Sequence, residues 1–77
     1  MPKITRMSDA EQAKADELRR TYGAGMLTRE QIGQELGLKH TATGNWVKDV
    51  PLVEVNGRPK YQVSDVARKI CANRVEL

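Results

Sequence analysis

The first apolar stripe along the chain predicts a helix from Asp9 to Tyr22. Ser8 and Glu11 stand three residues apart at its start, which is the spacing of a capping box. Apolar residues then recur at the spacing of one helix face, namely Ala15, Leu18 and Tyr22. Gly23 follows, and glycine commonly ends a helix. Residues 1–7 lack such a pattern and are expected to form a loose arm before this N-terminal helix, 8–22.

A second pattern of the same kind begins at Thr28. Thr28 and Gln31 form another capping box, Ile32 and Leu36 supply the apolar face, and Gly37 stands where the helix should end. After a short turn, a third helix is predicted over roughly Thr41 to Lys48. The segment 28–48 therefore has the order helix, tight turn, helix.

The third predicted helix is short and contains Gly44. Its expected inward positions are Ala42, Trp46 and either Thr43 or Val47. Glycine inside a helix costs about 1 kcal/mol relative to alanine. A close approach of another backbone is one explanation for Gly44. Pro51 ends the pattern, because the residue before proline avoids helical backbone angles.

The segment 52–63 predicts a β-hairpin, because Asn56-Gly57 lies between two short extended runs. A two-residue loop would place Val53 and Val55 on one face with the cations of the second strand. A three-residue loop, residues 56–58, would instead place Val53 opposite Tyr61 and separate an apolar face from a charged one. We favour the three-residue loop, because a half-buried strand must segregate its two faces. Pro59 lacks a backbone donor, so its strand should lie at an edge.

The last segment, 64–73, predicts a helix capped by Ser64. Its apolar stripe is Val66, Ala67, Ile70 and Cys71. The fold expected for residues 1–77 is a single, mostly α domain of about four helices with a two-stranded hairpin. A lone hairpin is marginal in water, so its apolar side, Val53 and Tyr61, should rest on the helices.

Composition and charge narrow the possible functions. The chain has 77 residues with 39% hydrophobic and 30% charged positions, which is typical of a small folded domain. It contains no apolar run of about 20 residues and no visible signal peptide, so a bacterial or phage cytoplasm is the expected location. Residues 1–36 hold six cations and six anions, whereas residues 37–77 hold seven and four, so the net charge of +3 lies in the second half. A basic face indicates a polyanionic partner, most often nucleic acid.

No arrangement typical of catalysis is visible, so an enzyme, a cofactor and a small-molecule ligand are not expected. His40 and Cys71 are too few ligands for a zinc site, and one cysteine excludes an intramolecular disulfide. Cys71 is expected to be a small core residue. Trp46 is expected in the core because it shares a face with Ala42.

The stretches LTREQIGQELGLKHTATGNWVKD and VEVNGRPKYQVSDVARKI, joined through Val50-Pro51, resemble the winged helix-turn-helix of the excisionase and MerR superfamily. The resemblance covers residues 27–70. It also extends to AlpA-type phage regulators and to the DNA-binding part of phage terminase small subunits. Because the chain stops at Leu77, a metal- or drug-sensing regulator is not expected.

The resemblance implies that the second helix of the motif reads bases and that the hairpin, the wing, contacts double-stranded DNA. The DNA-binding residues that follow are His40, Thr41, Asn45 and Lys48 in the reading helix and Arg58 and Lys60 in the wing. Thr28 and Arg29 are also expected to bind DNA, because they stand at a helix N-terminus, which suits a phosphate. Their chemistry agrees, because asparagine pairs with adenine, threonine contacts a thymine methyl and basic side chains neutralise phosphates. Two roles are equally possible for His40, a DNA contact or a plain solvated side chain. Arg58 and Lys60 have an alternative role as charges that protect an edge strand from aggregation.

The function expected is that of an excisionase-like protein of a phage or mobile element, with an integrase and neighbouring copies on DNA as further partners. A small phage-type transcriptional regulator and a terminase-like DNA-binder are alternatives. A protein-interaction module without DNA binding is a further alternative, favoured by the small residues Ala42 and Gly44 in the reading helix.

Overall fold

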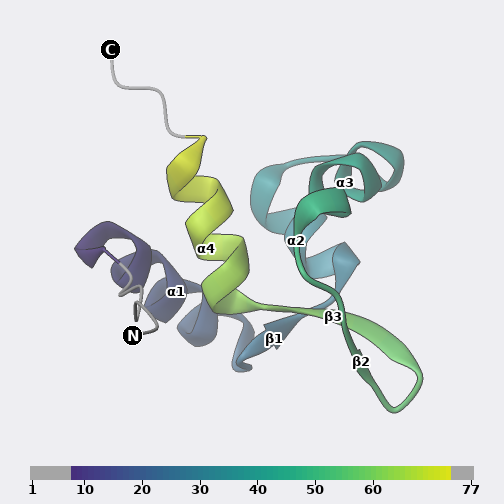
Figure 1. Cartoon of the computed structure of the whole chain (residues 1–77), viewed down its shortest axis with the longest axis horizontal. Coiled ribbons are helices and arrows are strands. Elements are labelled where there is room, and N and C mark those ends of the chain that lie inside the picture. Colours follow the sequence, from purple (N-terminus) through teal and green to yellow (C-terminus); the bar gives the residue numbers. More distant parts are fainter. Residues whose placement is uncertain (1–7, 74–77) are drawn as a thin grey trace, which may run out of the picture.

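The computed structural model describes residues 8–73, so the loose arm predicted for residues 1–7 lies outside the described part. The described chain is mostly helical and has a small antiparallel sheet of three strands (Figure 1). In chain order its elements are α1 (Asp9–Tyr22), β1 (Met26–Leu27), α2 (Arg29–Leu36), α3 (His40–Trp46), the 3-10 helix η1 (Val47–Asp49), β2 (Val53–Val55), β3 (Arg58–Gln62) and α4 (Val63–Ala72).

Both predicted capping boxes are present. At the start of α1, the Ser8 backbone N–H donates to Glu11 Oε1 at 2.8 Å, and the Glu11 N–H donates to Ser8 Oγ at 3.2 Å. At the start of α2, Thr28 and Gln31 make the same pair of bonds at 2.9 and 3.2 Å. These bonds satisfy backbone donors that have no partner within the helix, so both N-termini begin where local chemistry predicts.

Both helices also end at glycine. Gly23 and Gly37 have φ angles of 67° and 70°, which is the left-handed region that residues with a Cβ rarely adopt. The Gly23 N–H donates to the Arg19 carbonyl and closes the last turn of α1. The tight turn between α2 and α3 therefore comprises residues 37–39, as the pattern predicts.

The core lies where α1 packs against α4 and where β1, β3 and the middle helices meet (Figure 1). Its most buried large side chains are Leu18, Leu27, Ile32, Val63 and Val66. Ala15 is also buried and Tyr22 packs against the core, so the predicted apolar face of α1 is confirmed. The N-terminal helix is therefore part of the core, and its removal would expose the apolar face of α4.

The third helix differs from the prediction in extent and in orientation. It begins one residue earlier, at His40, and changes to a 3-10 turn after Trp46. Ala42 is exposed, so its predicted inward position is wrong; Thr43 and Val47 are the buried positions. The buried Thr43 hydroxyl donates to the Lys39 carbonyl at 2.9 Å, so this polar side chain enters the core with its hydrogen bond satisfied.

The favoured hairpin register is wrong, and the two-residue loop is correct. Val53 pairs with Lys60 and Val55 pairs with Arg58. Asn56 and Gly57 both have positive φ angles, 52° and 77°, as this tight turn requires. The hairpin tip projects away from the helices (Figure 1), so backbone turn geometry outweighs the segregation of faces there.

The strand β1 was not predicted, and it decides where the buried part of the hairpin lies. It pairs Leu27 with Tyr61, which makes β3 the central strand in the order β1-β3-β2. The prediction that the strand of Pro59 lies at an edge is therefore wrong for the strand as a whole. Pro59 forms a pair with Glu54 next to the hydrogen-bonded pair that closes the turn, so its nitrogen faces away from β2. The pairing with β1 starts only at Tyr61, so no ladder bond is lost at Pro59.

The last helix starts before its predicted cap. It begins at Val63, and no side chain caps it, so the capping role predicted for Ser64 is wrong. The chain passes directly from β3 into α4, and the Val63 N–H donates to the Gly25 carbonyl at 3.1 Å. Sheet pairing thus determines the start of the helix. Val66 and Ala67 are buried as predicted, and Ile70 and Cys71 are half-buried.

Candidate functional site

The residues predicted to bind DNA lie on three segments: the start of α2, the α3–η1 segment and the β2–β3 hairpin. In Figure 1, α3 and the hairpin lie on the side of the molecule opposite α1. All of these residues are on the surface or half-buried. Segments that are separate in the sequence therefore face one side of the described molecule.

A shallow depression of about 260 Å³ joins two helix starts with the hairpin. Four predicted site residues line it, namely Thr28, Arg29, His40 and Arg58. Glu30 and Pro59 complete its lining, so one carboxylate accompanies the cations. The fold thus brings half of the predicted set to one place.

The other four predicted residues do not line this depression. Thr41, Asn45 and Lys48 are exposed at the spacing i, i+4 and i+7, which places them along one face of the α3–η1 segment. Lys60 is half-buried on β3, opposite Val53. The candidate surface is therefore an exposed helix face beside a depression and a hairpin, and it is not a closed pocket.

Five cations of this surface make no ion pair with another described residue: Arg29, Lys39, Lys48, Arg58 and Lys60. Lys39 was missed among the predicted site residues, although its place in the turn directly before α3 was a signal. It is exposed and its side chain makes no capping bond. Unpaired cations keep their attraction for an external anion, because no nearby carboxylate neutralises them.

The side chain of Arg29 points along the protein surface toward α3. Its Nη2 donates to the backbone carbonyl of His40 at 2.8 Å. The guanidinium lies against Gly44, where an added Cβ would be 2.3 Å from Nη2. A side chain, and not another backbone, therefore makes the close approach at Gly44.

Lys69 on α4 connects that helix to the end of α3. Its ammonium group donates to the Trp46 carbonyl and to the Asp49 carboxylate, and it lies 4.5 Å from the centre of the Trp46 ring. The bond from Lys69 lowers the pKa of Asp49 below its ordinary value. Trp46 is half-buried against the core, so its expected core position is only partly correct. Sequence periodicity gave no signal for this contact, because the partners are far apart along the chain.

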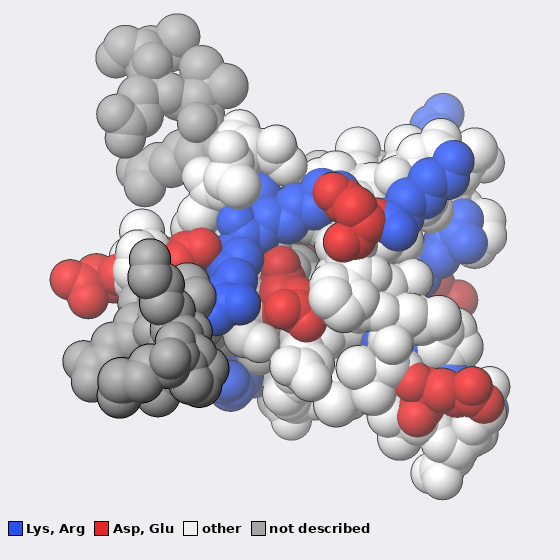
Figure 2. Space-filling view, in the orientation of Figure 1, with Lys and Arg blue, Asp and Glu red and all other residues white. Residues whose placement is uncertain are grey.

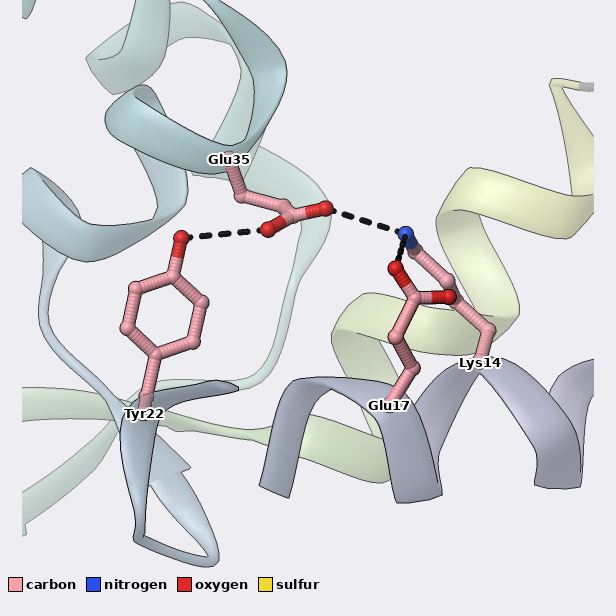
Figure 3. A network of polar contacts seen from close by, with 4 residues as sticks. All are labelled: Lys14, Glu17, Tyr22 and Glu35. Carbon is pink, nitrogen blue, oxygen red and sulfur yellow. Dashed lines mark hydrogen bonds and ion pairs between the residues drawn. The ribbon is translucent and has the colours of Figure 1, made fainter. Parts of the chain in front are cut away.

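A second polar network connects α1 to α2 (Figure 3). The Glu35 carboxylate accepts from Lys14 Nζ at 3.0 Å and from the Tyr22 hydroxyl at 3.1 Å, and Glu17 also accepts from Lys14. Burial is the largest single effect on Lys14 and lowers its pKa, but the bonds and charges of Glu35 and Glu17 together outweigh burial, so the pKa of Lys14 is raised. Burial and the Glu35 carboxylate raise the pKa of Tyr22. Each charged group of this network therefore has a partner of opposite charge within the protein.

Charge is mixed on the face shown in Figure 2. Basic side chains over α4 and toward α3 alternate there with carboxylates. Within residues 8–73, no cluster of three or more His, Cys, Asp or Glu side chains is suited to hold a metal ion. No helix in the same range is both long and apolar enough to cross a membrane.

The chain was compared with protein families, with curated proteins and with solved structures. No family model, no curated protein and no solved structure matches it.

Proposed function

We propose that the chain is a small DNA-binding protein built as a winged helix-turn-helix. In this proposal α2 and α3 form the helix-turn-helix, α3 enters the major groove and the β2–β3 hairpin is the wing. The observation that carries the proposal is the set of unpaired cations around α3 and the hairpin: Lys39, Lys48, Arg58 and Lys60. A surface of this kind attracts the phosphate backbone of DNA.

The exposed face of α3 supplies groups that suit base recognition. Asn45 can pair with an adenine edge, and Thr41 can contact a thymine methyl. His40 lies at the helix start, beside the depression that Arg58 also lines. Lys48 follows on the same face and suits a phosphate. The wing cations, Arg58 and Lys60, would neutralise phosphates beside the groove.

The resemblance to excisionases favours an architectural role in recombination on a phage or mobile element. An integrase and neighbouring copies of the chain would then be protein partners on DNA. A small phage-type regulator and a terminase-like DNA-binder share the same binding mode. A bend in the bound duplex, measured by cyclisation of short fragments, would favour the excisionase-like role among these three.

Amide NMR during titration with duplex DNA, at low and at moderate salt, tests the binding mode. We expect amide shifts at residues 39–48 and 56–60 that weaken as salt rises. The preferred DNA site would then be selected from a random pool of duplexes. Replacing Lys48 and Arg58 by glutamine should reduce the slope of log affinity against log salt by about 2, since each phosphate contact contributes about 0.9. Arg20→Gln with Arg68→Gln is the matched control, because it removes two exposed cations from α1 and α4.

Two outcomes would contradict the proposal. Shifts confined to α1, or no shifts at all, would remove DNA as the ligand of this surface. If the slope of log affinity against log salt fell equally in the Lys48/Arg58 variant and in the control, DNA would be attracted to the protein without a defined binding face. Either result would favour the protein-interaction module, for which exposed Ala42 and the 60% exposed Leu52 offer apolar contact area.

A further inference from the structure

The side chain of Arg29 fills the space that Gly44 leaves open. An added Cβ at Gly44 would lie 2.3 Å from Arg29 Nη2 and 2.7 Å from Arg29 Cζ, which is closer than real Cβ contacts allow. The same Nη2 donates to the His40 carbonyl at 2.8 Å. One guanidinium thus contacts α3 at two places, and only glycine at position 44 permits this seat.

A second close contact lies one turn further along α2. An added Cβ at Gly33 would lie 2.6 Å from Thr43 Oγ1 and 3.2 Å from the Leu38 carbonyl oxygen. Arg29 and Gly33 are four residues apart on one face of α2, and they meet the neighbouring residues Gly44 and Thr43 of α3. Each contact pairs a glycine with a larger side chain, so the two helices approach closely along this seam.

We propose that Arg29 is a positioning residue for α3: seated on Gly44, its guanidinium sets the direction in which α3 presents His40, Thr41 and Asn45. This inference rests on the proposed DNA-binding function. It replaces the phosphate contact predicted for Arg29 from its place at a helix N-terminus, and it explains a glycine that lowers helix propensity in the reading helix.

The surroundings of Arg29 support positioning over phosphate contact. Its Nε is buried and has no hydrogen-bond partner among the described residues, so this donor is not offered to a ligand at the surface. One N–H of Nη2 is already used by the His40 carbonyl. Arg58 lies on the wing and is exposed, so it serves as the comparison residue.

The test measures affinity for the selected duplex and for unrelated duplex over a range of salt concentrations. We expect Arg29→Ala and Gly44→Ala each to weaken binding to the selected site about tenfold, the scale of one lost base contact. Affinity for unrelated DNA and the salt slope should stay unchanged for both variants. Arg58→Ala should instead reduce the slope by about 0.9 and weaken both duplexes alike.

The double variant Arg29→Ala/Gly44→Ala adds a sharper readout. Once the guanidinium is gone, the alanine at position 44 meets no clash, so the double variant should bind no more weakly than Arg29→Ala alone. Amide shifts of α3 in the free protein should move in both single variants. If Arg29→Ala does not fold, Arg29→Lys is the second variant, because lysine keeps the charge but lacks the planar guanidinium that lies against Gly44. It should reduce the preference for the selected duplex and leave the slope of log affinity against log salt unchanged.

The outcomes separate this inference from the proposed function. If Arg29→Ala reduces the salt slope as Arg58→Ala does, or if Gly44→Ala binds the selected site like the wild type, the positioning role is overturned while DNA binding stands. If the wild type binds no duplex at low salt, the proposed function fails, and the inference fails with it.

Discussion

The α1–α4 half and the α3–hairpin half of the molecule use charge in opposite ways. On α1 and α4, Lys14, Arg19 and Lys69 each bond to a carboxylate of this chain. Around α3 and on the hairpin, Lys39, Lys48, Arg58 and Lys60 make no such bond within residues 8–73. Arg20 and Arg68 are exposed exceptions on the first side.

This difference separates residues that hold the fold together from residues available to a partner. Two of the paired cations bridge helices: Lys14 bonds to Glu35 of α2, and Lys69 bonds to Asp49 of η1. Arg19 bonds to Asp16 within α1. The unpaired cations contact solvent beside the exposed face of α3. Loss of a paired charge should therefore lower stability, whereas loss of an unpaired cation should weaken binding. The four changes below test this division, from the largest expected effect on the free energy of unfolding to the smallest.

Replacing Leu18 by alanine should cause the largest loss of stability. Leu18 has no exposed surface and lies in the core where α1 packs against α4. The variant should lose about 3 kcal/mol, from the lost transfer free energy and from the cavity left behind. Urea denaturation measures the loss, with Leu52→Ala as the matched control, because Leu52 is 60% exposed. If Leu18→Ala lost as little stability as Leu52→Ala, α1 would not be part of the core.

Gly33→Ala tests the seam between α2 and α3. An added Cβ would collide with the Thr43 hydroxyl and press on the Leu38 carbonyl oxygen, which cannot move without shifting the backbone. We expect a loss of about 1–2 kcal/mol, because overpacking outweighs the better helix propensity of alanine. Gly25→Ala is the control, because nothing lies within 4 Å of its added Cβ. An unchanged melting temperature for Gly33→Ala would contradict the close approach.

Glu35→Gln tests the network between α1 and α2, and it carries a pH dependence. At neutral pH we expect a loss of about 1 kcal/mol from weakened hydrogen bonds to a charged group. The pKa values of Lys14 and Tyr22 are raised above their ordinary values of 10.5 and 10.0. Because raised pKa values favour the protonated forms in the folded state, this stabilisation is complete below those ordinary values and is lost as pH rises through the folded-state pKa values.

The variant should therefore show a flatter decline of stability in alkaline solution than the wild type. Urea denaturation at neutral and at alkaline pH measures both curves. Glu17→Gln is the matched control, because Glu17 contacts Lys14 alone and is more exposed than Glu35. If the stability of the wild type and of Glu35→Gln fell in parallel as pH rises, the network would not be coupled to the deprotonation of Lys14 and Tyr22.

Replacing Lys48 and Arg58 by glutamine should have the smallest effect on stability. Neither side chain is in an ion pair with a described residue, so the unfolding free energy should change by no more than about 0.5 kcal/mol. Urea denaturation of the same protein used for the DNA titration measures this change. A loss above 1 kcal/mol would mean that these cations hold the fold together, and the division between the two halves would fail.

Features that depend on near neighbours in the chain could be predicted from the sequence. Ser8 with Glu11 and Thr28 with Gln31 set both helix starts, since each bond spans three residues. Gly23 and Gly37 set the helix ends through their left-handed backbone. Asn56-Gly57 favours a two-residue turn, and this local preference predicts the register that is observed in the hairpin. The eight predicted site residues could also be placed on their elements, because α2, α3 and the hairpin were predicted near their observed positions.

The burial of faces and the contacts between distant residues depend on how the elements pack together. β1 pairs Leu27 with Tyr61, which makes β3 the central strand of the sheet. The approach of α2 turns Thr43 inward and Ala42 outward, and it explains Gly44 through the seat of Arg29. Lys69 reaches Trp46 and Asp49 from the far end of the chain. The pattern of side chains within one segment shows that the segment has an apolar face. The segment that covers this face comes from elsewhere in the chain, and the packing of the two segments decides which side chains are buried.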